Sequence, residues 1–202
     1  MRVPFPRLAI AGLLSSMLAA PLLADTLITL DRNGAGELPV EYRDADNLRI
    51  GRDDAPNWYL TADGKEFVIM SSPDGSKRFA MNMDEFLARD DAPRAVEPDL
   101  ESFTVTRADR QEIIQGVNGQ VYLINGQGRS WELVLTEDDT VAAVTEAVYG
   151  AEIRMARMSG QAASAQPLAS ELALARSLGA AGILRGQLYT LAGMSQEEAL
   201  SD

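Results

Sequence analysis

Apolar residues recur at every second position over most of the chain from Thr26 to Thr136, and this period constrains the fold more than any other feature. Turn-forming segments such as "NGAG", "ADGK" and "SSPDGS" interrupt the alternation. Alternation with Asn-Gly and Asp-Gly turns is typical of antiparallel hairpins that bury one face. No helix of crossover length separates these strands, so we expect an antiparallel meander rather than a parallel sheet.

The segment "DEFLARDDAPRAVEPDL" interrupts this pattern. Its charges and prolines predict a short helix or loop from Asp84, followed by an extended crossing near Pro93 and Pro98. Strand signals then resume in "SFTVTR", "QEIIQG", "GQVYLIN" and "RSWELVLT". The turn "NGQG" between the last two predicts a tight hairpin.

After Thr136 the hydrophobic period changes to that of helices. "TEDDTVAAVTEAVYGAEIRMARM" begins with a capping residue and acids, and its valines recur at helical spacing. A second helix is predicted to start at Pro167 and to stop at Gly179 or Gly182, with "AASAQ" as a linker before it. "ILRGQLYTLAGM" predicts one last strand. This order predicts an α+β fold in which a curved antiparallel sheet is covered by a few helices on one face.

The first residues, "MRVPFPRLAIAGLLSSMLAAPLLADT", have the order of a secretory signal peptide. Two arginines precede an apolar run from Leu8 to Leu23, and the small residue Ala24 offers a cleavage site, with a cut near Ala20 as the alternative. An uncleaved anchor is disfavoured, because a spanning helix needs roughly 20 apolar residues. We therefore expect a signal peptide over residues 1–24 and one soluble periplasmic domain over residues 25–202.

Composition excludes several classes of function. The chain has 30 acidic and 18 basic residues and a net charge of −12, which disfavours nucleic acid and anionic lipid as partners. It has no cysteine and no histidine, so disulfides, Ser-His and Cys-His nucleophiles and common zinc sites are absent. Neither lysine fits an S-x-x-K pattern, and no phosphate loop is present. The sequence predicts a protein that is not an enzyme and has no cofactor.

Three weaker motifs leave alternatives open. "DADN", from Asp44 to Asn47, could hold calcium, but it lacks the loop glycine and terminal glutamate and therefore favours an acidic turn. Methionine thioethers could hold Cu(I), and the candidates are Met70, Met81, Met83, Met155 and Met158. Because the chain has no histidine or cysteine to complete such a site, a role in packing is favoured. Adjacent acids could supply catalytic carboxylates, although solvated surface is favoured for Asp53 with Asp54, Asp90 with Asp91, and Asp138 with Asp139.

The segments "NWYLTADGKEFVIM", "KRFAMNM", "QEIIQGVNGQVYLI" and "WELVLTEDD" together resemble a group of uncharacterised periplasmic domains related in fold to the outer-membrane lipoprotein carrier, the LolA-like fold. The resemblance spans residues 40–158 and includes a G-x-x-G-x-x-Y pattern at Gly116, Gly119 and Tyr122. It implies a strongly curved, incomplete antiparallel β-barrel whose open side is closed by helices around an apolar cavity. The chain departs from the group at its end, where "EEALSD" stands in place of an F-x-L-P segment.

These observations lead to two hypotheses of function. In the first, the exported protein binds an acyl chain, lipid or lipoprotein without catalysis in a concave sheet, and the predicted lining is Trp58, Leu60, Phe67, Ile69, Phe79, Met81, Met83, Trp131 and Leu133. In the second, an envelope interaction or assembly protein has a filled core and docks a protein partner at an exposed strand edge. A continuous cavity favours the first, whereas a solid core with an open edge favours the second.

Overall fold

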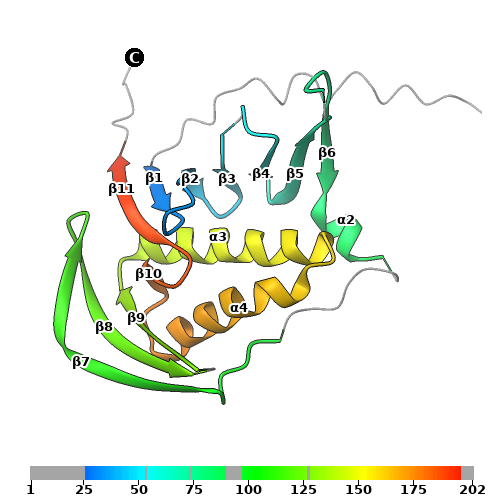
Figure 1. Cartoon of the computed structure of the whole chain (residues 1–202). Helices are drawn as coiled ribbons and strands as arrows, with labels where there is room; N and C mark the ends of the chain where they lie inside the picture. Colours follow the sequence, from blue (N-terminus) through cyan, green and yellow to red (C-terminus); the bar gives the residue numbers. More distant parts are fainter. Residues whose placement is uncertain (1–25, 53, 73, 90–96, 127, 197–202) are drawn as a thin grey trace, which may run out of the picture.

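The computed structural model describes residues 26–52, 54–72, 74–89, 97–126 and 128–196 as one open antiparallel sheet with three helices (Figure 1). The predicted signal peptide over residues 1–24 lies outside the described residues, as do Asp53, Asp90, Asp91 and Pro93. The order of the elements confirms an α+β fold built on an antiparallel sheet.

The strands form two meanders. The first comprises β1 Thr26–Asp31, β2 Glu37–Asp44, β3 Asn47–Ile50, β4 Asn57–Ala62, β5 Lys65–Ser71 and β6 Arg78–Asn82. The second comprises β7 Phe103–Ile114, β8 Val117–Gly126, β9 Arg129–Thr136, β10 Gly182–Arg185 and β11 Thr190–Gln196. Because β11 pairs with β1, the meanders join into one sheet of 11 strands, in the order β6-β5-β4-β3-β2-β1-β11-β10-β9-β8-β7.

Two strand predictions need correction. "SFTVTR" and "QEIIQG" belong to one continuous strand, β7, whose pairing with β8 shifts register between Arg107 and Gln111. The last predicted strand is instead two strands, because the chain reverses between β10 and β11. The N–H of Gly186 closes this turn by donating to the carbonyl of Tyr189 at 2.8 Å.

Three helices connect the strands. Helix α2, Met83–Leu87, follows β6 as predicted, and the side chain of Asn82 caps it by accepting the N–H of Glu85. Helix α3, Asp139–Met158, and helix α4, Ala162–Ser177, lie between β9 and β10 in the chain. In Figure 1 these two helices lie between the first meander and the hairpin of β7 and β8.

The two long helices begin for different reasons. The predicted helix α3 is confirmed, and its cap is Asp138, whose carboxylate accepts the N–H of Val141 at 2.9 Å, rather than Thr136, which ends β9. Helix α4 begins at Ala162 rather than at Pro167, so the prediction of a linker over "AASAQ" is wrong. Alanine has the highest helix propensity, and a proline close to the N-terminus of a helix removes few backbone hydrogen bonds.

A row of apolar side chains crosses the first meander from strand to strand. From β1 to β6 the residues in register are Ile28, Val40, Ile50, Tyr59, Val68 and Met81. This side of the sheet faces α3, because Ile28 lines a small void together with Val144 of α3, and the Tyr59 hydroxyl accepts a hydrogen bond from Arg154 of α3. We call it the helix face. Most of the row belongs to one hydrophobic core that includes Val144 and Val148 of α3.

The G-x-x-G pattern of β7 and β8 has a local packing reason. Gly116 forms the hairpin turn with a φ of 81°, a conformation that glycine adopts readily. A Cβ atom at Gly119 would lie 2.5 Å from Val134 Cγ1 and 2.7 Å from Leu184 Cδ1. Any larger residue at Gly119 would therefore have to displace the side chains of Val134 and Leu184.

Candidate functional site

The side chains predicted to line an apolar cavity divide between the two faces of the sheet. Strand β5 pairs with β6 so that Met70 lies beside Phe79 and Phe67 beside Asn82. Phe67 and Phe79 therefore lie on opposite faces, and the expectation that they share one face is wrong. The cause is the register across the turn from Ser72 to Lys77, which alternation within each strand does not determine.

The structure groups the predicted residues as follows. The helix face carries Phe79, Met81, Trp131 and Leu133, and Met83 is buried at the start of α2. The opposite face of the first meander carries Trp58, Leu60, Phe67 and Ile69. Phe79 is 53% exposed, whereas Leu133 belongs to the core. The predicted set therefore does not form a single ligand site in this conformation, and its role in ligand binding stays a prediction.

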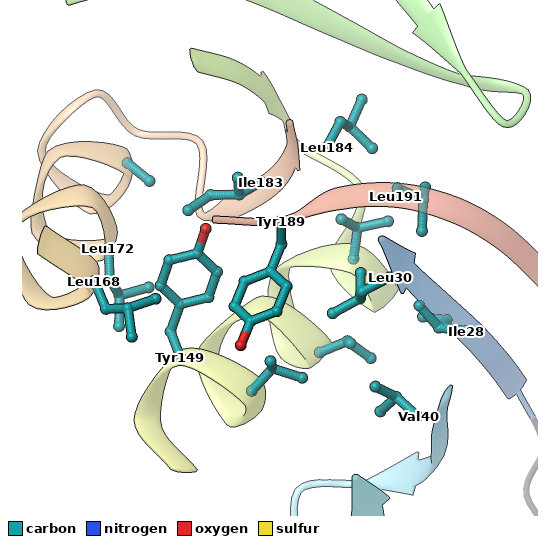
Figure 2. Close-up of a cluster of buried hydrophobic side chains, with 14 of the residues drawn as sticks. Ile28, Leu30, Val40, Tyr149, Leu168, Leu172, Ile183, Leu184, Tyr189 and Leu191 are labelled. Carbon is teal, nitrogen blue, oxygen red and sulfur yellow. The ribbon is translucent and has the colours of Figure 1, made fainter. Parts of the chain in front are cut away.

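The space between the helix face and α3 is filled by side chains. A void of only about 10 Å³ is lined by Ile28 and Leu30 of β1, Val144 and Val148 of α3, and Leu191 of β11, together with their neighbours. Figure 2 shows several of these side chains converging from the strands and from α3. A cavity needs roughly 10–15 Å³ to hold one water molecule, and sites for larger ligands measure about 300–1,000 Å³. An acyl chain does not fit at this place unless α3 moves.

The opposite face has an apolar cluster of its own. Ile69 is 2% exposed and lies beside Trp58 in the β4–β5 pair, yet neither residue is part of the main core. The Arg49 guanidinium lies 5.9 Å from the centre of the Trp58 ring and forms an ion pair with Glu41. The cation–π contact and the ion pair link the buried Trp58 of β4 to Arg49 of β3 and Glu41 of β2.

A buried acid joins α4 to the turn between β10 and β11. The Glu171 side chain is 1% exposed, and its two carboxylate oxygens accept the N–H of Gln187 at 3.1 and 3.2 Å. The Tyr149 hydroxyl of α3 donates to the same carboxylate at 3.3 Å. No basic side chain within the described chain bonds this carboxylate. Burial is the main cause that raises the pKa of Glu171 from 4.5 to about 7.

The turn is shaped to receive this acid. A Cβ atom at Gly186 would lie 1.5 Å from Glu171 Oε1, so the carboxylate occupies the space that a side chain would need. The rings of Tyr149 and Tyr189 pack edge to face at 5.8 Å, with their hydroxyl groups pointing in opposite directions (Figure 2). The Tyr189 hydroxyl donates to Glu152 at 2.8 Å. Hydrogen-bonded polar groups therefore lie between α3, α4 and the turn from β10 to β11.

A small pocket opens between the first half of α4 and the ends of β7, β8 and β9. Its volume is about 140 Å³, and we call it the α4 pocket; it is lined by Phe103, Gly126, Arg129, Trp131, Ala163, Gln166, Pro167, Ser170 and Gln187. The rings of Phe103 and Trp131 meet edge to face at 5.6 Å and form its aromatic wall. Trp131 is the one predicted ligand residue that lines this pocket.

Several sequence motifs have structural roles instead of chemical ones. The Asp44 carboxylate of "DADN" accepts the N–H of Asp46 at 2.9 Å and the amide of Asn47 at 3.0 Å, which are the bonds of an Asx turn. Asp138 caps α3, and Asp54 forms an ion pair with Arg52 at 2.9 Å. No cluster of three or more acidic side chains suited to a metal ion occurs among the described residues. None of the helices described is long and apolar enough to cross a membrane.

The comparisons with known proteins leave the chain without a family assignment. No family model, no curated protein and no solved structure matches it. The resemblance to LolA-like domains therefore stays a prediction.

Proposed function

We propose that this protein is an exported, non-catalytic interaction protein of the cell envelope that docks a partner polypeptide along the free edge of β7. The observation that carries the proposal is the filled interior, where a void of about 10 Å³ remains between the helix face and α3. Export rests on the signal-peptide pattern of residues 1–24. The acidic net charge of −12 fits a protein partner better than a nucleic acid.

The edge of β7 supports this mode of docking. Among the described residues β7 pairs only with β8, so one side of this 12-residue strand has no neighbouring strand. The register shift between Arg107 and Gln111 disturbs its second half, and such irregularities protect an edge against pairing. The regular stretch from Phe103 to Arg107 is the part able to accept an added strand. Edge strand β6, with 5 residues, is shorter and leads directly into α2.

The proposal is tested by crosslinking at the edge. A photo-reactive residue at Thr104 or Thr106, both exposed on β7, should give one adduct of defined mass in intact cells. The same group at Leu123, exposed on the neighbouring strand β8, is the matched control and should give none. Equal labelling at all three positions, or none at any, would contradict docking at this edge. Fractionation of the same cells tests the periplasmic location.

A second candidate function is the binding of an apolar ligand in a strongly curved, barrel-like sheet. It is favoured by the position of α3, which bonds strands that lie far apart in the sheet order: Arg154 donates to the Tyr59 hydroxyl of β4, and the Thr145 hydroxyl accepts the N–H of Ile183 of β10. A sheet that bends around a single helix would give that arrangement. The ligand, an acyl chain, lipid or lipoprotein, would enter as α3 moved away from the helix face. The test is a native mass measurement of detergent-free mature protein, followed by extraction; a stoichiometric acyl ligand would favour this candidate over docking.

A further inference from the structure

The α4 pocket has a chemical character that differs from the rest of this acidic chain. None of the described residues that line it is an Asp or Glu, although the chain has 30 of these. Its charged group is Arg129, which forms no ion pair within the described chain. The amides of Gln166 and Gln187 add further donors. The lining therefore offers hydrogen-bond donors and positive charge to an electron-rich group.

Two further donors in the lining, the indole N–H of Trp131 and the hydroxyl of Ser170, are shielded from solvent. The indole Nε1 of Trp131 is buried and has no hydrogen-bond partner among the described residues. The Ser170 side chain is 2% exposed, and its hydroxyl oxygen accepts the N–H of Asp99 at 3.1 Å. No acceptor for the Ser170 hydrogen is found within the described residues, so this donor is also unused. A buried donor without a partner is unfavourable, and a side-chain adjustment that let an acceptor in the pocket reach the indole N–H would relieve that cost.

The size and walls of the pocket limit what can enter. Its volume of about 140 Å³ is close to that of a cavity of about 150 Å³ that accommodates benzene. Phe103, Trp131 and Pro167 supply apolar walls for a ring or a short aliphatic chain. The ligand is therefore a single small group with an apolar part and an acceptor part.

We propose that the α4 pocket binds a carboxylate carried on an apolar group of about the size of a benzene ring. Arg129 and the indole N–H of Trp131 face the carboxylate, and the aromatic wall contacts the apolar part. Two sources share this chemistry: a free small acid, and the C-terminal residue of a polypeptide. The proposal does not rest on docking at β7.

The first test is a titration of the mature protein with benzoate, followed by ligand-detected NMR. We expect saturable binding with a Kd on the order of 1 mM, as suits a ligand of this size. Benzyl alcohol, which has the same ring without the charge, should bind about tenfold more weakly. The two tryptophans give an optical readout: in Trp58→Phe, the remaining Trp131 should change its fluorescence as benzoate binds.

Variants locate the site. Trp131→Phe keeps the aromatic wall but removes the N–H, and it should weaken benzoate binding about tenfold. Arg129→Gln, at an exposed position that is expected to leave folding unchanged, should weaken it similarly. Trp58→Phe, on the opposite face of the sheet, is the matched control and should bind as the unmodified protein does. Equal affinity for benzoate and benzyl alcohol, or equal affinity in the Trp131 and Trp58 variants, would overturn the proposal.

A second arm identifies the source of the carboxylate. A short peptide that ends in phenylalanine is compared with the same peptide carrying a C-terminal amide. If the peptide with a C-terminal carboxylate binds at least as tightly as benzoate and the amidated peptide does not bind, the pocket recognises the C-terminus of a polypeptide. If benzoate binds and neither peptide does, the pocket takes a free small acid. Absence of saturable binding by both benzoate and the acid peptide would refute the site.

Discussion

Two acidic side chains connect helices to the rest of the fold, and they are stabilised in different ways. Glu66 of β5 forms an ion pair with Arg154 of α3, which also donates to the Tyr59 hydroxyl at 3.3 Å. The Glu66 and Arg154 side chains remain 20% and 30% exposed. Helix α3 is therefore held to the first meander by opposite charges that water partly reaches.

Glu171 of α4 has the reverse environment. It is more deeply buried than Glu66, and its donors, the N–H of Gln187 and the hydroxyl of Tyr149, carry no charge. Removing an unpaired carboxylate from water is unfavourable, and the effect of burial on the pKa of Glu171 outweighs the opposite effect of the hydrogen bonds from Gln187 and Tyr149. The comparison shows that, beyond the apolar core that both helices share, α3 is fixed by a charge pair and α4 by shape and hydrogen bonds around one acid.

The largest expected effect comes from filling the space that Glu171 occupies. Gly186→Ala would place a Cβ atom 1.5 Å from Glu171 Oε1, so the acid would have to leave its donors. We expect a loss of about 3 kcal/mol in the free energy of unfolding, measured by chemical denaturation.

Gly193→Ala is the matched control for this substitution. The nearest side-chain atom to its Cβ is 3.8 Å away, and the free energy of unfolding should change by no more than about 0.5 kcal/mol. If Glu171 is the cause of the loss, Gly186→Ala should lose much less stability in a Glu171→Ala background. Similar losses in both glycine variants would show that the turn resists alanine for another reason.

The second effect is a pH dependence that belongs to Glu171. Its pKa is about 7 in the folded state against 4.5 ordinarily, so the folded state binds the proton more tightly. The stability of the protonated form is fully present below pH 4.5 and is lost as pH rises through 7. A shift of this size corresponds to about 3 kcal/mol. The free energy of unfolding is measured by denaturation at a series of pH values. As pH rises from 4.5 to 8, the free energy of unfolding of Glu171→Gln should increase relative to that of the unmodified protein by up to this amount. A difference that stays constant over this range would contradict the burial argument, and Glu146→Gln, at an exposed site, serves as the control.

The sequence could predict most of the fold because strands and helices carry different periods. Alternation and the turns "NGAG", "ADGK" and "SSPDGS" indicated the antiparallel strands of the first meander, and the change to helical spacing after Thr136 indicated α3. Alternation determines which residues of one strand share a face, but not which residues of the next strand lie beside them. The register of Met70 beside Phe79 depends on the intervening turn, and for that reason the predicted ligand set was divided between two faces.

The buried acid had a signal in the sequence that pattern analysis did not use. Glu171 is the only charged residue between Arg157 and Arg176, in the helix "PLASELALARS". A helix with apolar residues on most sides is usually buried, so a single acid within it is a candidate for an unusual environment. The α4 pocket had no comparable signal, because its walls come from β7, β9 and α4, and only folding brings these segments together.

A smaller effect is expected when the charge pair of α3 is broken. Arg154→Met leaves Glu66 without its cation, and we expect a loss of about 1–2 kcal/mol, less than for a fully buried pair. Adding Glu66→Gln should restore part of this loss, which a double-mutant cycle by denaturation would measure. Strictly additive losses would mean that Arg154 acts through packing on α3 and not through the charge of Glu66.

The smallest effect should come from an ion pair that joins the same two helices at the surface. Arg176 of α4 bonds Glu146 of α3, and their side chains are 53% and 49% exposed. Because water screens such a pair, Arg176→Gln should change the free energy of unfolding by no more than about 0.5 kcal/mol. The change should vanish in 1 M salt, where the Debye length is about 3 Å, whereas the pH dependence assigned to Glu171 should persist there. A loss of several kcal/mol in Arg176→Gln would instead mean that surface charge, and not the buried contacts of Glu171, holds α4 against α3.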